Sequence, residues 1–278
     1  LRIVFTGSSV MRLKEENPEL NGIVKSYNLR GLSCREFLNM QTGNNFQPYS
    51  LEEILSNHER IIKQILPKVS PLKHFQDYIH HGFYPFYKEN RNYSENLLKT
   101  MSMMAEVDIL LIKQIELKYL TKIKKLFYLL TVNGQKAPNI SLLAKEIETS
   151  RATVMNYIKY LADARLINMI YTVGQEFPKK PSMLMLHNSN LLYAIDPVNV
   201  DHQLAMETFF VNSMWKDHKV NNGGREGIFI VDDKRKFRVC DAALPQKMRM
   251  SPDTIYARYN TEVGKDNQIP LWLLGFLY

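Results

Sequence analysis

Apolar side chains recur three or four positions apart between residues 139 and 161, a spacing that places them on one face of a helix. They form two groups, Leu143 with Ile147 and then Val154, Ile158 and Leu161. The polar stretch 148–150 separates the two groups. The pattern therefore predicts two short helices joined by a tight turn.

Residues that can cap a helix stand where each of these helices should begin. Either Asn139 or Ser141 can accept a backbone N–H group at the start of the first helix, and Ser150 can do so for the second. The predicted unit is a helix–turn–helix, a motif that places the outer face of its second helix in the major groove of DNA.

The outer face of the second helix is polar, and we interpret four of its residues as DNA-binding: Arg151, Thr153, Asn156 and Lys159. Two strands are predicted to follow, at 167–171 and 183–186. The Pro-Lys-Lys-Pro segment 178–181 lies between them. It would form the wing of a winged helix, from which Lys179 and Lys180 would reach flanking phosphates.

Helical and strand patterns alternate through the rest of the chain. Helices are predicted at 11–16, 33–38, 51–66, 71–80, 93–116, 121–131, 190–194 and 204–215. Strands are predicted at 1–5, 23–29, 219–221, 227–231, 237–240, 255–259 and 271–277, with a hairpin turn at 232–234. We therefore expect a mixed α/β, multi-domain protein.

The positive charge of the chain is concentrated around the predicted winged helix. The net charge is +8, and residues 113–180 contain twelve Lys or Arg against five Asp or Glu. Clustered positive charge beside a helix–turn–helix favours binding to phosphates. The alternative stays open that the lysines at 118, 122, 124 and 125 only solvate a helix or help to dock a protein.

The remaining composition favours a cytoplasmic protein without a membrane partner. The two cysteines, Cys34 and Cys240, lie far apart, and no apolar run approaches the roughly 20 residues that span a bilayer. No secretory leader is recognisable at the start. The pair His80-His81 suggests a metal, but adjacent residues of an α-helix point about 100° apart and no Cys or carboxylate cluster accompanies them, so no metal site is predicted.

Three segments, taken in order, resemble a known family. They are Phe-Thr-Gly-Ser-Ser at 5–9, Gly-Leu-Ser-Cys-Arg-Glu-Phe-Leu at 31–38, and Ile-Pro-Leu-Trp-Leu-Leu-Gly-Phe-Leu-Tyr at 269–278. The chain resembles prokaryotic AAA+-type ATPases that have a helical lid, a winged helix and a C-terminal restriction-endonuclease-like domain of unknown function. The resemblance implies an AAA+-like α/β remnant at 1–45, a lid at 46–116, a winged helix at 117–186 and a small nuclease-like α/β domain at 187–278.

The resemblance also implies a nucleotide sensor at Thr6 and Ser8, beside the γ-phosphate of ATP. An equally open interpretation is that these hydroxyl groups cap a following helix. The sequence contains no G-x-x-x-x-G-K-[ST] loop to hold the phosphates. The chain therefore resembles only the C-terminal part of such an ATPase, with no cofactor of its own, whereas the intact family uses ATP and Mg²⁺.

The nuclease-like part of the resemblance assigns a helix carboxylate to Glu207. Ile228 and Arg238 stand where such folds carry metal-binding carboxylates on a hairpin. Metal-assisted phosphodiester hydrolysis needs those charges. We therefore expect a degenerate nuclease site, with no catalytic residue and no bound metal.

These observations lead to one expected function and one alternative. The chain is expected to be the non-catalytic C-terminal part of an AAA+-like ATPase. Through its winged helix it would bind double-stranded DNA, a protein partner or the missing ATPase half. The alternative is an ATP-dependent enzyme whose P-loop half is missing from this chain. Whether the protein is an enzyme stays open, and the chain alone is expected to be inactive.

Overall fold

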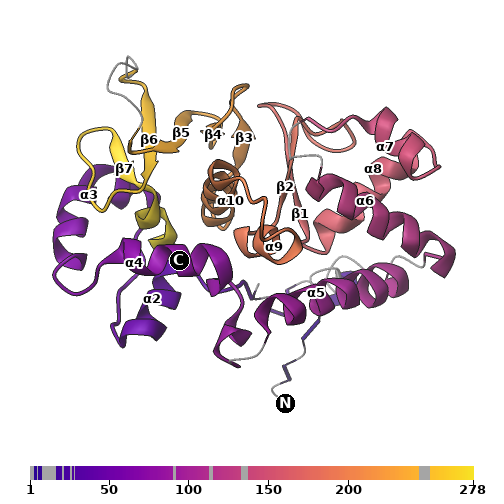
Figure 1. Ribbon diagram of the computed structural model, residues 1–278, viewed down its shortest axis with the longest axis horizontal. Helices are drawn as coiled ribbons and strands as arrows, with labels where there is room; N and C mark the ends of the chain where they lie inside the picture. Colours follow the sequence, from indigo (N-terminus) through magenta and orange to yellow (C-terminus); the bar gives the residue numbers. More distant parts are fainter. Residues whose placement is uncertain are drawn as a thin grey trace. The chain divides into compact units, whose positions relative to one another are not determined.

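The computed structural model describes residues 3–4, 6–7, 17–20, 22–25, 27, 29–89, 92–112, 115–132, 137–243 and 251–278 (Figure 1). The fold is mixed α/β and divides into two compact units. The first unit comprises Leu1–Arg30, Glu95–Met169 and Phe177–His187, and the second comprises Gly31–Ser94, Ile170–Glu176 and Asn188–Tyr278. The two units do not coincide with the domain ranges 1–45, 46–116, 117–186 and 187–278. Those ranges follow from the family resemblance and stay predictions.

A five-stranded sheet forms the frame of the second unit. Its strands are β3 (Val220–Asn222), β4 (Ile228–Val231), β5 (Arg235–Asp241), β6 (Thr254–Tyr259) and β7 (Gln268–Pro270), in that spatial order. Strands β3, β4 and β5 pair antiparallel, whereas β5, β6 and β7 pair parallel. The strands predicted at 219–221, 227–231, 237–240 and 255–259 are thus confirmed, with ends that differ by at most two residues.

Helix α10 (His202–Met214) packs against this sheet through aromatic side chains. The ring of Phe210 stacks on Phe229 of β4, with 5.2 Å between centroids, and also contacts Phe237 of β5. The predicted turn at 232–234 joins β4 to β5. Asp232 and Asp233 there adopt the left-handed conformation, with φ of 54° and 58°, that a tight two-residue hairpin turn uses.

Several other helical segments belong to the second unit. They are α2 (Cys34–Thr42), α3 (Leu51–Ile65), α4 (Pro71–Asp77), the π-helix Tyr78–Gly82, the 3-10 helix Pro85–Glu89 and α9 (Ser189–Ile195). A capping box begins α2, since Ser33 accepts from the backbone of Glu36 while Glu36 accepts from that of Ser33. Ser50 and Glu53 form the same arrangement on α3.

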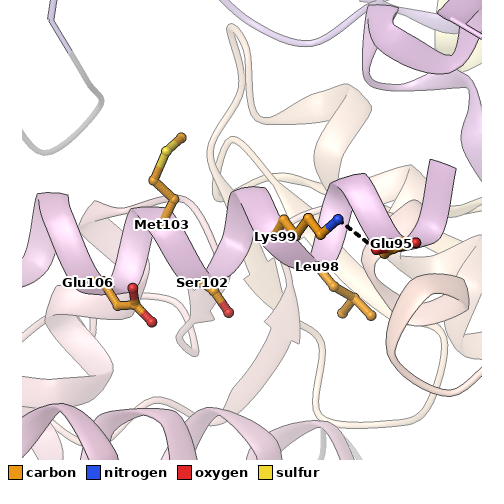
Figure 2. Close-up of a pocket in the computed structure, with 6 residues that line it drawn as sticks. All are labelled: Glu95, Leu98, Lys99, Ser102, Met103 and Glu106. Carbon is orange, nitrogen blue, oxygen red and sulfur yellow. Dashed lines mark ion pairs between the residues drawn. The ribbon is translucent and has the colours of Figure 1, made fainter. Parts of the chain in front are cut away.

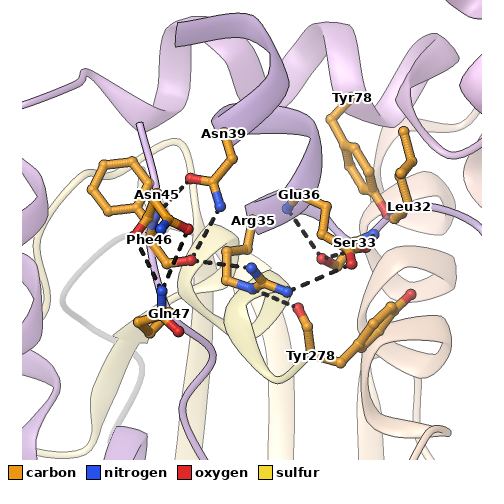
Figure 3. A network of polar contacts seen from close by, with 10 residues as sticks. All are labelled: Leu32, Ser33, Arg35, Glu36, Asn39, Asn45, Phe46, Gln47, Tyr78 and Tyr278. Carbon is orange, nitrogen blue, oxygen red and sulfur yellow. Dashed lines mark hydrogen bonds and ion pairs between the residues drawn. The ribbon is translucent and has the colours of Figure 1, made fainter. Parts of the chain in front are cut away.

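Two of the segments that carry the family resemblance contact each other in the second unit. Arg35 of α2 donates to the backbone oxygens of Tyr278 (2.9 Å) and Phe46 (3.0 Å), as Figure 3 shows. The side-chain amide of Asn39 donates to the backbone oxygen of Phe46 and accepts from the backbone N–H of Phe46. Helix α2 therefore anchors both the loop that follows it and the segment around Tyr278.

The strand predicted at 271–277 is wrong, because this segment forms the 3-10 helix Leu271–Phe276. All six of its residues are buried. A short, continuous apolar run fits a buried strand or a buried helix equally well, and pattern alone could not separate them. Close packing decides here: a Cβ atom added to Gly275 would lie 2.4 Å from the Cβ atom of Cys34 in α2.

The first unit contains the predicted helix pair and the two strands after it. Its elements are the 3-10 helix Pro18–Leu20, α5 (Tyr93–Met103, which begins in the second unit), the π-helix Met104–Ile112, the 3-10 helix Leu117–Tyr119, α6 (Leu120–Val132), α7 (Ile140–Glu146), α8 (Arg151–Asp163), β1 (Ile167–Ile170) and β2 (Met183–Leu186). Strands β1 and β2 form a two-stranded sheet. Ile123 and Leu126 of α6 and Ile158 of α8 are fully buried in the core.

The strands predicted at 1–5 and 23–29 are wrong for the residues that the structure describes there. Ile3 and Val4 are 69% and 91% exposed, and Ile23 and Leu29 are 80% and 94% exposed. None of these residues belongs to a strand. An apolar run becomes a buried strand only where a neighbouring strand and a covering layer receive it. The helix predicted at 11–16 lies outside the described residues.

The side chain of Asn190 connects α9 to the π-helix of the second unit. Asn190 is fully buried, and its amide nitrogen donates to the backbone oxygens of Tyr78 (2.9 Å) and Ile79 (2.8 Å). Its amide oxygen accepts from the backbone N–H of Phe83 (2.8 Å) and the hydroxyl of Tyr93 (2.7 Å). A π-helix leaves backbone groups outside the regular α-helical ladder. Asn190 pairs the carbonyl oxygens of Tyr78 and Ile79 at the start of the π-helix and the N–H group of Phe83 just after its end.

Replacing Asn190 should therefore destabilise the second unit strongly. Asn190→Asp keeps the size and one acceptor but removes both donors, which leaves buried carbonyl oxygens unpaired at a cost of about 3 kcal/mol or more. Denaturant unfolding measures this loss. The control is Asn199→Ala in an exposed loop, which should cost less than about 0.5 kcal/mol. Equal effects of the two substitutions would contradict the role of Asn190.

Candidate nucleic-acid interface

The turn between α7 and α8 is fixed by side-chain and backbone hydrogen bonds. Of the two candidate caps for α7, Asn139 is the one used, and it accepts from the backbone N–H of Leu142 at 3.1 Å. Ser150 caps α8 as predicted, accepting from the backbone of Thr153 at 3.0 Å. Glu148 has a left-handed φ of 52°, which lets the chain reverse within three residues. The two predicted helices and the turn between them are confirmed.

Helix α8 presents its predicted apolar stripe to the core and its polar residues outward. Val154, Ile158 and Leu161 are fully buried. Arg151 and Asn156 are exposed, and Thr153 is partly exposed. Arg151 has no hydrogen-bond or ion-pair partner in the described part of the chain. The first turns of α8 can therefore meet a ligand without disturbing the core.

Lys159 is less available than the sequence suggested. Its ammonium group forms an ion pair with Asp163, one turn later, and the Asp163 side chain is only 9% exposed. A nearly buried carboxylate needs a compensating charge, since burial disfavours its ionised form. Lys159 therefore has a structural task within α8, and its role in binding DNA stays a prediction.

The segment between β1 and β2 carries the other two predicted cations. Residues 173–180 are all exposed, and they include Lys179 and Lys180. Neither lysine has a partner among the described residues. Their charges are thus free to meet phosphates.

The lysines of α6, in contrast, support the helix pair from within the protein. Lys122 donates to the backbone oxygen of Glu148 and Lys125 to that of Glu146, each at 2.6 Å. Carbonyl groups at the C-terminal end of a helix lack intrahelical partners and carry partial negative charge, so these two lysines cap α7. Both ammonium groups are therefore engaged within the protein, and each keeps its positive charge.

Two further lysines nearby are also engaged. Lys118 pairs with Glu116 at 2.6 Å, and Lys124 pairs with Glu106. Lys113 and Lys136 lie outside the described residues. One cation that the sequence analysis did not select, the exposed Lys145 of α7, has no partner in the described part of the chain. Its place in the last turn of the first helix was visible in the sequence.

An open hollow of about 340 Å³ lies along α5 and the first turn after it (Figure 2). It is lined by Glu95, Leu98, Lys99, Ser102, Met103 and Glu106. Lys99 and Glu95 form an ion pair of 2.6 Å on this surface. All six side chains come from one continuous helical segment, so the hollow does not gather polar groups from several elements, as ligand pockets generally do.

Glu207 lies in the second unit, near the hairpin that the sequence analysis paired with it. The carboxylate is 3% exposed and accepts from the amide of Gln203 at 2.7 Å. That same amide donates to the Val239 backbone, while Tyr259 donates to the Gln203 oxygen. A Cβ atom on Gly227 would come within 3.5 Å of Glu207, so the start of the hairpin is close by.

The residues opposite Glu207 offer no carboxylates at the two expected hairpin positions. Ile228 and Arg238 are directly paired across β4 and β5. Among the described residues, no group of three or more His, Cys, Asp or Glu side chains could hold a metal. The interpretation of this place as a degenerate nuclease site stays a prediction.

Only one of the two residues of the predicted nucleotide sensor lies among the described residues. Thr6 is exposed, and Ser8 lies outside the described residues. Their role therefore stays a prediction. No helix within the described ranges is both long and apolar enough to cross a membrane.

Removing Lys159 should cost stability rather than binding alone. Lys159→Ala removes the ion pair with the nearly buried Asp163, and a loss of about 1–2 kcal/mol is expected from thermal or denaturant unfolding. Lys179→Ala, at an exposed and unpaired position, should change stability by less than about 0.5 kcal/mol. Adding Asp163→Asn to Lys159→Ala should restore part of the loss, and no restoration would contradict this account.

Comparisons with known proteins give two similarities for this chain. Residues 72–198 match the model of a family described as a domain of unknown function (DUF8612). The chain is 26% identical over 178 residues to an uncharacterized protein of Methanocaldococcus jannaschii, an alignment that covers 62% of this chain and 37% of that protein. The chain thus spans little more than a third of that relative's length. No solved structure matches the chain. The segment similar to the family includes α5 to α9 and all six predicted DNA-binding residues.

Proposed function

We propose that α6, α7, α8, β1 and β2 form a winged helix that binds double-stranded DNA, within a non-catalytic C-terminal part of an AAA+-like ATPase. The observation that carries this proposal is a set of exposed cations that have no partner within the described part of the chain, Arg151 at the start of α8 and Lys179 and Lys180 between β1 and β2. They stand at the two places from which a winged helix contacts DNA.

The order of the elements supports the proposal. In helix–turn–helix proteins the N-terminal residues of the second helix contact base edges in the major groove. Arg151, Thr153 and Asn156 occupy that part of α8, and their side-chain types can read bases or hold phosphates. The lysines of α6 contribute indirectly, because Lys122 and Lys125 fix the turn that orients α8.

In this proposal the rest of the chain has no catalytic role. Residues 1–45 correspond to the remnant of the AAA+-like core, with Thr6 and Ser8 at the former sensor. The second unit contains the nuclease-like sheet. Glu207 is held by Gln203, and the hairpin offers Ile228 and Arg238 where Mg²⁺ would need carboxylates, so phosphodiester cleavage is not expected.

Salt dependence of duplex binding tests the proposal. If Arg151, Lys179 and Lys180 each neutralise one phosphate, log K should fall with log salt at a slope of about −2.7. Affinity should be modest, on the order of micromolar, because a single winged helix makes few contacts. Fluorescence anisotropy of a labelled duplex between about 50 and 200 mM salt gives both values.

Matched substitutions separate DNA binding from docking of a protein on the same face. Arg151→Ala should weaken binding about tenfold, and Lys179→Ala with Lys180→Ala should lower the slope by about 1.8. Lys216→Ala, an exposed cation in the second unit, serves as the control and should change neither value. Absence of duplex binding at about 50 mM salt, or binding that survives the Arg151 and Lys179/Lys180 substitutions together, would favour the protein-docking alternative.

A further inference from the structure

The π-helix Tyr78–Gly82 brings two adjacent histidines together. In an α-helix, consecutive side chains diverge by about 100°, which is why the sequence argued against a joint role for His80 and His81. In the structure their Nδ1 atoms lie only 3.3 Å apart. The expectation of diverging side chains is therefore wrong for this pair.

The two rings are held by side chains from several elements. Tyr193 of α9 packs on His80, with 4.8 Å between ring centroids. Tyr87 and Tyr93 lie 6.0 and 5.9 Å from His81. The same helix α9 supplies Asn190, which fixes the carbonyl groups of the two residues before His80. Both the backbone and the rings of the pair are thus positioned before any ligand arrives.

The separation of the two nitrogens suits a tetrahedral metal ion. Zn²⁺–N bonds of about 2.0–2.1 Å at a tetrahedral angle place two ligand nitrogens about 3.3–3.4 Å apart. Square-planar or octahedral ions, with angles near 90°, would need a separation of about 2.9 Å. We propose that His80 and His81 form a two-histidine site for a divalent ion of the zinc class, with the remaining positions left to water or to another ligand.

Binding needs a change of tautomer but no net loss of protons. A neutral pair at this separation can share one hydrogen between its two Nδ1 atoms, and the tautomer decides which ring donates it. When both Nδ1 atoms bind the ion, the hydrogen of the donor ring moves to its Nε2 atom. Each imidazole then stays neutral, and the ion keeps its two positive charges.

Calorimetric titration of the protein with ZnCl₂ tests the site. One ion should bind with a dissociation constant on the order of 10–100 μM, weaker than a structural site because only two protein ligands converge. His80→Ala and His81→Ala should each weaken binding about tenfold or more, since even the loss of an outer-shell partner costs that much. His74→Ala on α4, a partly exposed histidine of the same unit, should leave binding unchanged.

Nitrogen NMR of the histidine rings gives a second measurement that does not depend on the substitutions. Zinc should shift the Nδ1 resonances of His80 and His81 and leave a hydrogen on each Nε2 atom. The proposal is overturned if those resonances do not move at millimolar zinc. It is overturned equally if the affinity is the same in His80→Ala, His81→Ala and His74→Ala.

Discussion

Four hydrogen bonds of one buried amide side chain, that of Asn190, connect separate segments of the second unit. Asn190 joins α9 to the π-helix Tyr78–Gly82, to Phe83 and to Tyr93, using two donor and two acceptor interactions. A buried polar group is costly unless it is paired, and here each partner pairs the other. The aromatic residues between Phe83 and Tyr93 and the adjacent histidines take their places around this centre.

Some of the cations in the first unit have partners within the protein, and others are exposed and are proposed to bind DNA. Lys122 and Lys125 cap α7, and Lys159 neutralises Asp163. These cations stabilise the helix pair. Arg151, Lys179 and Lys180, and also Lys145 of α7, have no partner among the described residues, so the proposed interface rests on fewer unpaired cations than the sequence count of basic residues suggested.

Local signals in the sequence were sufficient for most helices and for the inner strands of the sheet. Capping residues such as Ser33, Ser50 and Ser150 mark helix starts by their own chemistry, and the turn at 232–234 has the residues that tolerate a positive φ. Tertiary contacts decided the rest. Leu271–Phe276 forms a 3-10 helix in which Gly275 packs against Cys34. The apolar residues Ile3 and Val4 are exposed where a strand was expected.

The candidate sites show the same limit of pattern-based reasoning. The outward face of α8 could be predicted from its periodicity, but the engagement of Lys159 depends on the burial of Asp163, which periodicity does not reveal. The approach of His80 to His81 depends on a π-helix whose carbonyl groups are held by a residue more than a hundred positions away. Spacing along the chain carries no signal for such an interaction.

Hydrogen exchange with and without duplex DNA tests the central claim, that the first unit binds DNA through α8 and the β1–β2 connection. The account predicts that DNA slows exchange in peptides covering residues 150–157 and 177–182, while peptides covering α10 and β3 to β5 are unchanged. Protection confined to the second unit, or no protection at a duplex concentration well above micromolar, would contradict it.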